Sequence, residues 1–423
     1  MAIFYPTTDI LPLRRLCKVL TTQATPSGIY RAKLTFTVDG APFLVNGLPV
    51  TIYAAPSVGS SFDTFTFDLE REVEAALAAK RRAAGAVSSS FFSAPIFQNV
   101  NTNTVLLEVN IEYFELDDSN GYNEIVSSSA SDDSSSFTVV NMNTGRRLDF
   151  TVADVVADNA GKWPAGTVPL LTDAPRTQPI AIEQSAFIQA LNGATNKFTH
   201  IRVSAYDSTG ANAFTDYIAM GSPADYAYSL ASVSPKQLDA ATWIVGHAPL
   251  LVVKNAAYYT VDFGVYSGGS YTKRSEQMRF DIQPNCNDGL RVHFENRYGA
   301  GDSYTFNLTK FYNAETSWEG FTESDNGGFY NAIYNRERRY NLEQGFTYEA
   351  RSGGITEAER LWLEQMLLSP EIFIEAYDSD GIAYPVPVTI VNADQKQVGN
   401  DFLLYEFNVT LQEANKEVST AQW

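Results

Sequence analysis

A two-residue alternation that begins at Leu290 constrains the fold more than any other feature of this sequence. Leu290, Val292 and Phe294 alternate with polar residues, as a half-buried strand requires. The segment 296–302 contains glycines and an aspartate, which is typical of a turn, and the alternation resumes at Tyr304. The sequence therefore predicts a hairpin with an aromatic face, and no catalytic residue is conspicuous within it.

The size and composition of the chain extend this prediction to the whole molecule. A chain of 423 residues is long enough for about three domains that each bury a core. Apolar residues make up 44% and aromatic residues 13% of the sequence, which favours pleated, half-buried surfaces. We expect a mainly β protein with several domains that resemble β-sandwiches or barrels, and with one helix in each of the N-terminal and C-terminal units.

The pattern of strands and turns divides the chain into four parts. The expected parts are an N-terminal β domain (1–116), a polar serine-rich loop or linker (117–136), a middle β-sandwich-like domain (137–285) and a C-terminal β domain (286–423). The run from Ser127 to Ser136 is too polar to pack, so it is either an exposed loop near a boundary or a tether. Strands resume at Phe137, which favours the loop.

Helical periodicity predicts the helix of the N-terminal unit at about 68–84. The apolar residues that repeat at helical spacing are Phe65, Leu69, Val73, Ala76 and Leu77. Gly85 follows the last turn as a stop signal.

Capping residues predict the helix of the C-terminal unit at about 356–368. Thr356 and Glu359 have the spacing of a capping box, and Pro370 disfavours helical geometry in the residue before it. A further short helix is expected in the middle unit near Pro235 to Ala241.

The charge of the chain argues against nucleic acid as a partner. The formal net charge is −19, whereas phosphate backbones are bound by lysine and arginine. No segment is apolar for the length that a membrane span requires, and Met1 to Leu20 lacks a continuous apolar core. We therefore expect a protein made in the cytoplasm, with no membrane insertion.

Cysteine and histidine do not form a metal or nucleophile motif. Cys17 and Cys286 lie far apart in the sequence, so whether they pair or remain free thiols stays open. His200, His247 and His293 are also widely separated, and we interpret His200 and His293 as hydrogen-bonded structural residues on strands.

Acidic pairs offer the nearest approach to a catalytic pattern. The pairs are Asp117/Asp118, Asp132/Asp133 and Asp378/Asp380. Each has the residue types of glycosidase carboxylates, but turn and surface roles explain all three. The segment from Asp378 to Gly381 begins like a calcium loop but lacks the closing acid. We expect no enzymatic activity and no cofactor, and a weak divalent cation site in the acidic loops stays open.

An aromatic cluster is the best candidate for a binding site. Its residues are Trp318, Phe329, Tyr330 and Tyr334. Aromatic rings stack on sugars, which suits contact with a glycan. Tyrosine and tryptophan are equally typical of an interface between subunits, which we prefer.

Motifs in the C-terminal unit resemble those of a known class of proteins. Cys286, the Asn-Arg-x-Gly-x-x-Asp turn at 296–302 and the tryptophan-bearing helix from Trp362 to Pro370 resemble virion structural, tail-type proteins of phages that infect Bacteroidetes-like hosts. The resemblance implies a non-enzymatic virion component, made in the host cytoplasm. No functional residue is carried over, because the shared residues build turns and cores.

The resemblance implies that the protein works by presenting or connecting other proteins. We expect a symmetric homo-oligomer in the viral tail or baseplate, or a connector for other virion proteins, which would be its partners. The alternative is a carbohydrate-binding adhesin or receptor-binding protein that contacts a host surface glycan.

Overall fold

The computed structural model describes the following residues: 10–14, 18–24, 29–42, 44–45, 48–55, 57–58, 62–83, 97–100, 104–117, 124–127, 133–143, 167–239, 241, 243–244, 256–283, 289–323, 336–377, 379, 383–398, 404–414 and 417–419. Within these residues the protein is mainly β, as predicted, with several separate sheets and three helices. The described strands form open sheets, and none of these sheets closes into a barrel.

The N-terminal unit is built on a seven-stranded sheet. Its strands are, in order, β1 (Ile10–Arg14), β13 (Asp133–Asn143), β11 (Thr104–Asp117), β3 (Ile29–Val38) and β4 (Ala41–Pro42), with β12 (Glu124–Ser127) beside β11 and β7 (Thr51–Ala54) beside β3. A second sheet contains β2 (Lys18–Ala24), β9 (Phe62–Asp68) and β8 (Ser57–Val58), and β5 (Leu44–Val45) pairs with β6 (Leu48–Pro49). Helix α1 (Glu70–Ala83) packs its apolar face into the core of this unit.

The turn between β3 and β4 shows how the sequence fixes this sheet. Asp39 and Gly40 have φ angles of 50° and 77°, which a two-residue hairpin turn requires. The Asp39 carboxylate accepts a hydrogen bond from the Leu106 backbone N–H at 2.9 Å and pairs with Lys80 of helix α1 at 2.8 Å. One aspartate therefore joins the hairpin, its neighbouring strand and the helix.

The helical pattern expected from the sequence includes one residue, Phe65, that does not belong to helix α1. Phe65 belongs to β9, where Phe65 and Phe67 are buried and Thr66 is exposed, so it follows strand alternation. The helix itself lies at Glu70–Ala83, close to the expected range. Phe65 also matched the helical pattern, because Leu69 follows it four residues later, which is the spacing of residues on one face of a helix.

The middle unit contains two sheets. One has the order β14 (Thr177–Ile180), β20 (Ser270–Ile282), β19 (Tyr258–Ser267), β16 (His200–Tyr206) and β17 (Asn212–Ala219). The other has the order β10 (Phe97–Val100), β18 (Tyr228–Ser232) and β15 (Phe187–Leu191). The expected short helix is α3 (Pro235–Asp239).

Two strand pairings cross the boundaries that we expect between units. Strand β10 comes from the N-terminal region but pairs with β18, with Phe97 opposite Ala231 and Val100 opposite Tyr228. Strand β13 lies in the N-terminal sheet beside β11 and begins at Asp133. The last residues of the expected loop at 117–136 are therefore strand, since Ser134 and Ser135 pair with β11.

The C-terminal unit is one eight-stranded sheet with a helix. Its strands are, in order, β22 (Gly301–Phe306), β21 (Leu290–Glu295), β25 (Ile372–Tyr377), β26 (Ala383–Val398), β27 (Leu404–Glu413), β24 (Arg336–Arg351) and β23 (Leu308–Glu323), with β28 (Glu417–Ser419) beside β24. The predicted capping box starts helix α4 (Glu357–Leu367), because the Glu359 N–H donates to Thr356 Oγ1 and the Thr356 N–H donates to Glu359 Oε2.

The middle and C-terminal units share one hydrophobic core. The same cluster of buried residues contains Ile188 and Phe263 from the middle unit and Val292, Trp362 and Phe407 from the C-terminal unit. The N-terminal unit has a separate core. We refer to the middle and C-terminal units together as the body.

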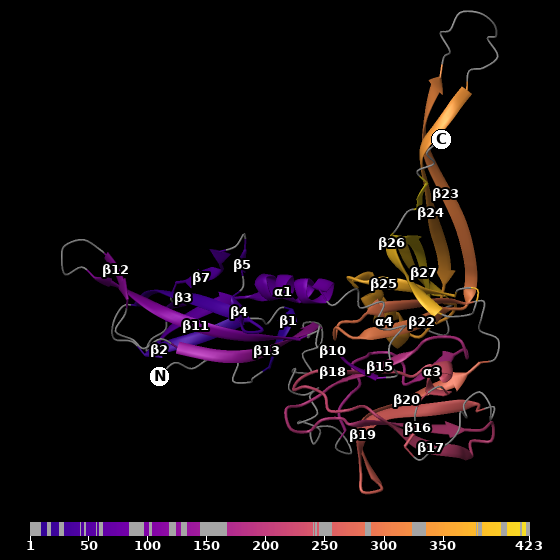
Figure 1. Cartoon of the computed structure of the whole chain (residues 1–423), viewed down its shortest axis with the longest axis horizontal. Coiled ribbons are helices and arrows are strands. Elements are labelled where there is room, and N and C mark those ends of the chain that lie inside the picture. Colours follow the sequence, from indigo (N-terminus) through magenta and orange to yellow (C-terminus); the bar gives the residue numbers. More distant parts are fainter. Residues whose placement is uncertain are drawn as a thin grey trace, which may run out of the picture.

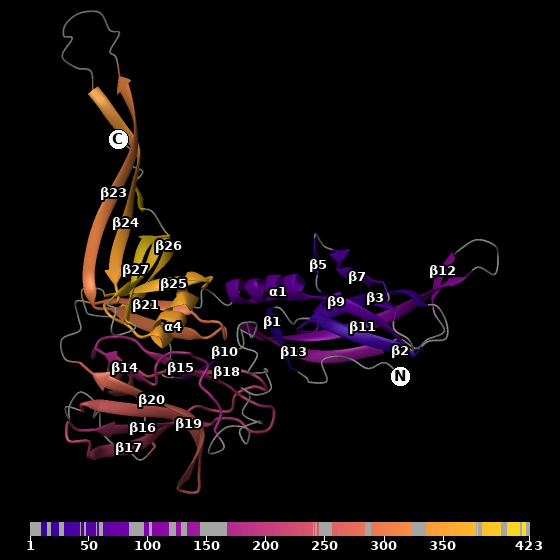
Figure 2. The same ribbon diagram turned by 180° about the vertical axis from the view of Figure 1, so that it is seen from behind.

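The paired strands β23 and β24 form a long arm that projects from the body. Figure 1 shows it rising above the C-terminal sheet, while the N-terminal unit extends to one side, and Figure 2 shows the same arrangement from behind. Each strand of the arm has 16 residues, which corresponds to about 50 Å of extended chain. No helix within the described residues is long and apolar enough to cross a membrane.

Candidate functional site

Most of the residues that we predicted for a site lie outside the described part of the chain. Trp318 belongs to strand β23, but its side chain lies outside the described residues, as do Phe329, Tyr330 and Tyr334. Their role in an interface or in glycan contact therefore stays a prediction. The following also lie outside it: Cys17, Cys286, His247, Asp118, Asp132, Asp378 and Asp380.

A buried polar network surrounds His293 at the junction within the body. The His293 Nδ1 atom lies 2.7 Å from Ser303 Oγ, and Nε2 lies 2.9 Å from Glu375 Oε2. The backbone N–H of Ser185 donates to both carboxylate oxygens of Glu375, at 3.2 and 3.1 Å. The Tyr377 hydroxyl also donates to Glu375. Hydrogen-bond donors from three segments of the body, those of Ser185, β21 and β25, therefore converge on one carboxylate.

The protonation states in this network follow from burial and hydrogen bonding. Burial lowers the pKa of His293, so its ring is neutral at pH 7. Burial alone would raise the pKa of Glu375, but its hydrogen bonds from His293 and Tyr377 outweigh this effect and hold that pKa below its usual value. An ionised Glu375 therefore accepts the His293 Nε2–H, and Nδ1 accepts the hydrogen of the Ser303 hydroxyl.

Serine, histidine and glutamate in this order resemble the residues of a hydrolase triad, but the geometry favours a structural role. Ser303 is only 7% exposed and His293 only 6%. A nucleophile needs a substrate carbonyl beside it, and this burial leaves no space for one. We therefore interpret the three residues as a satisfied buried network.

Arg291 extends the network across the junction. Its guanidinium donates from Nε and Nη2 to the Ser185 carbonyl, at 3.1 and 2.8 Å, and from Nη1 to Thr305 Oγ1 at 2.9 Å. Thr305 lies on β22 and Ser185 lies in the middle unit. The arginine side chain is buried because both sides of β21 are covered.

The Asn-Arg-x-Gly-x-x-Asp turn is a second connection between the two units. Asn296 donates from Nδ2 to the Leu171 carbonyl at 2.8 Å, and its Oδ1 accepts from the N–H groups of Tyr298 and Ala300. Gly299 has a φ angle of 68°, which glycine adopts without strain. The asparagine therefore closes its own turn and attaches that turn to the middle unit.

Arg297 of the same turn pairs with Asp173 of the middle unit. The shortest distance, between Arg297 Nε and Asp173 Oδ2, is 2.7 Å, and both side chains are largely buried. Asp173 also accepts hydrogen bonds from Gln365 of helix α4 at 2.7 Å and from the Tyr298 hydroxyl at 3.1 Å. The turn, the helix and the middle unit therefore meet at one aspartate.

The last residue of the motif, Asp302, anchors helix α4. It accepts a hydrogen bond of 2.7 Å from Trp362 Nε1. Burial raises the pKa of Asp302 to about 6, although hydrogen bonds from Asn296, Trp362 and Thr172 oppose the shift. Each specified residue of the motif thus has a packing or hydrogen-bonding role.

The outer face of the five-stranded sheet carries stacked tyrosines. Tyr206 stacks on Tyr258 with ring centroids 4.7 Å apart, and Arg279 lies 3.7 Å above the centroid of the Tyr258 ring. Tyr217 stacks on Tyr266 at 4.6 Å and on Tyr271 at 5.1 Å. These rings cover each other, so their faces are already used in packing and do not form an open platform for a sugar.

Beneath these rings lies a buried ion pair. Arg202 Nη2 lies 2.7 Å from Asp262 Oδ2, and the Tyr271 hydroxyl donates to Asp262 Oδ1 at 2.7 Å. Burial raises the pKa of Asp262, although the charge of Arg202 opposes the shift. Gly264 makes room for this arrangement, because a Cβ there would lie 2.5 Å from the Tyr271 ring and 2.3 Å from the Thr272 carbonyl.

His200 also has a structural role. Its Nδ1 atom lies 2.8 Å from Thr199 Oγ1 and 3.2 Å from the donating N–H of Tyr266. The ring packs edge-on against that of Tyr266. Within the described residues no group of three or more His, Cys, Asp or Glu side chains is arranged to hold a metal.

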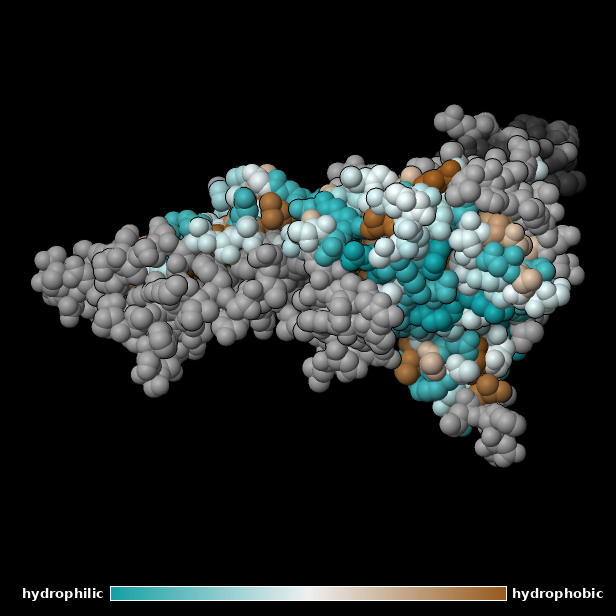
Figure 3. Space-filling model, turned by 90° about the horizontal axis from the view of Figure 1, so that it is seen from below, coloured by the Kyte–Doolittle hydropathy of each residue, from teal (hydrophilic) through white to brown (hydrophobic). Residues whose placement is uncertain are grey.

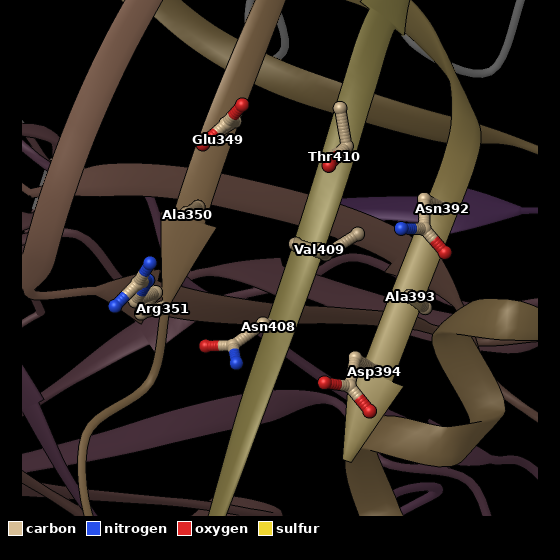
Figure 4. Close-up of a pocket in the computed structure, with 9 residues that line it drawn as sticks. All are labelled: Glu349, Ala350, Arg351, Asn392, Ala393, Asp394, Asn408, Val409 and Thr410. Carbon is tan, nitrogen blue, oxygen red and sulfur yellow. The ribbon is translucent and has the colours of Figure 1, made fainter. Parts of the chain in front are cut away.

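A shallow groove crosses the solvent-facing side of strands β24, β27 and β26. Figure 4 shows that two rows of polar side chains line it. The rows are Glu349, Thr410 and Asn392, and then Arg351, Asn408 and Asp394. The groove has a cavity volume of about 180 Å³. Asn408 Oδ1 is buried and has no hydrogen-bond partner among the described residues.

The described surface seen from below is mainly hydrophilic. In Figure 3 hydrophobic residues appear as separate areas between hydrophilic ones. Within the described part of that face, hydrophobic residues form no broad patch.

Comparisons with known proteins give no assignment. A scan against protein-family models finds no matching family, and a search of curated proteins finds no matching sequence.

Proposed function

We propose that this chain is a non-enzymatic structural subunit of a bacteriophage virion, acting as a symmetric oligomer in the tail or baseplate or as a connector for other virion proteins. The observation that carries the proposal is the arm, a pair of 16-residue strands that projects from the body (Figure 1). A two-stranded ribbon is marginally stable alone in water, so an arm of this kind is best explained by partners in an assembly.

The buried networks support the same proposal. The buried residues Glu375, Arg291 and Asp302 join the two units of the body, through Ser185 for the first two and through Thr172 for Asp302. A subunit that holds its neighbours in fixed positions needs its own two units to be firmly joined. The resemblance of the 296–302 turn to virion structural proteins agrees with this role.

The oligomeric state tests the proposal. Native mass spectrometry of the full chain, with light scattering over a range of concentrations, is expected to show one closed oligomer, because most soluble homo-oligomers have closed point-group symmetry. A strict monomer at high concentration that also fails to bind other virion proteins would contradict it.

A host-surface glycan receptor role is the second candidate, and the groove of Figure 4 favours it. Amide, hydroxyl and carboxylate groups line the groove, and such groups satisfy sugar hydroxyls. The Asn408 side chain lies between the other lining residues and is the group whose removal tests such binding.

Glycan-array binding is expected to depend on Asn408 if this second function holds. Asn408→Ala should weaken binding about tenfold, since it removes a hydrogen bond worth about 1.4 kcal/mol. Gln397→Ala, an exposed position on β26 outside the groove, is the matched control and should bind as the parent does. Equal binding by both variants would count against the groove.

A further inference from the structure

The arm has two strand edges that lack a partner among the described residues. Strand β23 ends the eight-stranded sheet, so its outer edge (Leu308–Glu323, the β23 edge) is free there. Strand β24 pairs on its other side with β27 at Thr347–Arg351 and with β28 at Leu342–Gln344. From Arg336 to Asn341, that side of β24 has no partner strand among the described residues. We refer to this part of the strand as the β24 edge. Unpaired backbone groups of this kind bind another strand.

The two edges carry opposite charge. The β23 edge has three glutamates and one lysine, Lys310 near its start, whereas the β24 edge has three arginines and one glutamate. Opposite charges on neighbouring strands stabilise a sheet, and like charges destabilise it. The acidic edge is therefore complementary to the basic edge.

The directions of the strands are compatible with this pairing. Within one arm β23 and β24 are antiparallel. When two arms point the same way, the β23 edge of one copy is antiparallel to the β24 edge of its neighbour. Repeating this contact gives a head-to-tail ring when the rotation between neighbouring copies closes.

We propose that the β23 edge of one copy pairs with the β24 edge of a second copy, so that the arms form a continuous antiparallel sheet around the oligomer. This inference rests on the proposed structural function and names its interface. It also explains the arm itself, because Glu319–Glu323 and Arg336–Tyr340 pair only with each other in the described single chain. Neighbouring arms give each ribbon further strands, which a stable sheet needs.

A symmetric contact between two β23 edges is the competing arrangement. It would place the glutamates of one strand beside those of another, with no basic residue between Phe311 and Glu323 to compensate. The charges therefore favour pairing of a β23 edge with a β24 edge over pairing of two β23 edges.

Crosslinking between differently tagged copies tests the inference. Both native cysteines are first replaced, as Cys17→Ser and Cys286→Ser. Thr322→Cys is then placed on the β23 edge of one full-length variant, and Glu337→Cys on the β24 edge of another. The two are co-expressed and treated with a short bismaleimide. We expect crosslinked dimers that contain one copy of each variant, and no crosslink from either variant alone.

A matched control separates the edge contact from chance proximity. Thr322→Cys is paired with Gln397→Cys, an exposed position on β26 of the body, and this pair should give no crosslink. Native mass spectrometry of the same samples reports the oligomer. An oligomer without the mixed Thr322→Cys/Glu337→Cys dimer overturns the edge pairing but leaves the structural function in place. Dimers from Thr322→Cys alone overturn it in favour of the symmetric contact. A monomer overturns the edge pairing, and it overturns the structural function as well only if the chain also fails to bind other virion proteins.

Discussion

Glu375→Ala is expected to destabilise the body by about 3–5 kcal/mol, because it removes one member of a buried, hydrogen-bonded ionic network. The Glu375 side chain has no exposed surface, and it accepts hydrogen bonds from the Ser185 N–H, His293 and Tyr377. Each donor left without a partner costs about 1–3 kcal/mol. Urea unfolding followed by circular dichroism measures the change.

An exposed glutamate on the same sheet provides the control for this result. Glu349→Ala should change the free energy of unfolding by less than about 0.5 kcal/mol, because Glu349 is exposed. Equal effects of the two substitutions would show that the junction network contributes nothing specific.

The effect of Glu375→Ala is also expected to depend on pH. The folded protein holds the pKa of Glu375 below its usual value of 4.5. The stabilisation by the ionised carboxylate is therefore present above pH 4.5 and is lost as the pH falls through the folded-state pKa. The difference between the parent and the variant should be largest near neutral pH and smaller in acid.

Trp362→Ala is expected to destabilise the body by about 3–5 kcal/mol, since it creates a cavity in the shared core. Trp362 is 2% exposed, packs against Phe294 and Tyr304, and donates to the buried Asp302. Loss of that donor leaves the Asp302 carboxylate less satisfied. The denaturant midpoint and the slope of urea unfolding test this prediction.

The neighbouring residue on helix α4 is the matched control. Leu361 is 48% exposed, so Leu361→Ala should shift stability by no more than about 0.5 kcal/mol. Since both substitutions put alanine in the same helix, helix propensity does not explain a difference between them. A large loss from Leu361→Ala would contradict the assignment of the buried face of α4.

Local patterns in the sequence predict the individual elements well. The alternation from Leu290 identifies β21, and the spacing of Thr356 and Glu359 identifies the start of helix α4. Both signals act over a few residues, so they are readable without knowledge of the partner elements. The mainly β class follows from many signals of this kind.

The polar side of β21 is where this reasoning failed. Alternation predicts that Arg291 and His293 face solvent, yet both are buried. The middle unit covers that side of the strand, with Ser185 supplying the partner for Arg291. Contacts between residues about a hundred positions apart leave no local signal, so Arg291 and Glu375 could not be recognised as a site.

The pairing of strand β10 has a consequence for the synthesis of the chain. Val100 leaves the ribosome long before Tyr228, its partner on β18, and the adjacent strand β11 is made directly after it. Strand β10 must therefore stay unmatched until β18 of the middle unit emerges. Late closure of this kind slows folding and exposes the nascent chain to aggregation, so we expect its yield to depend on translation rate and on chaperones.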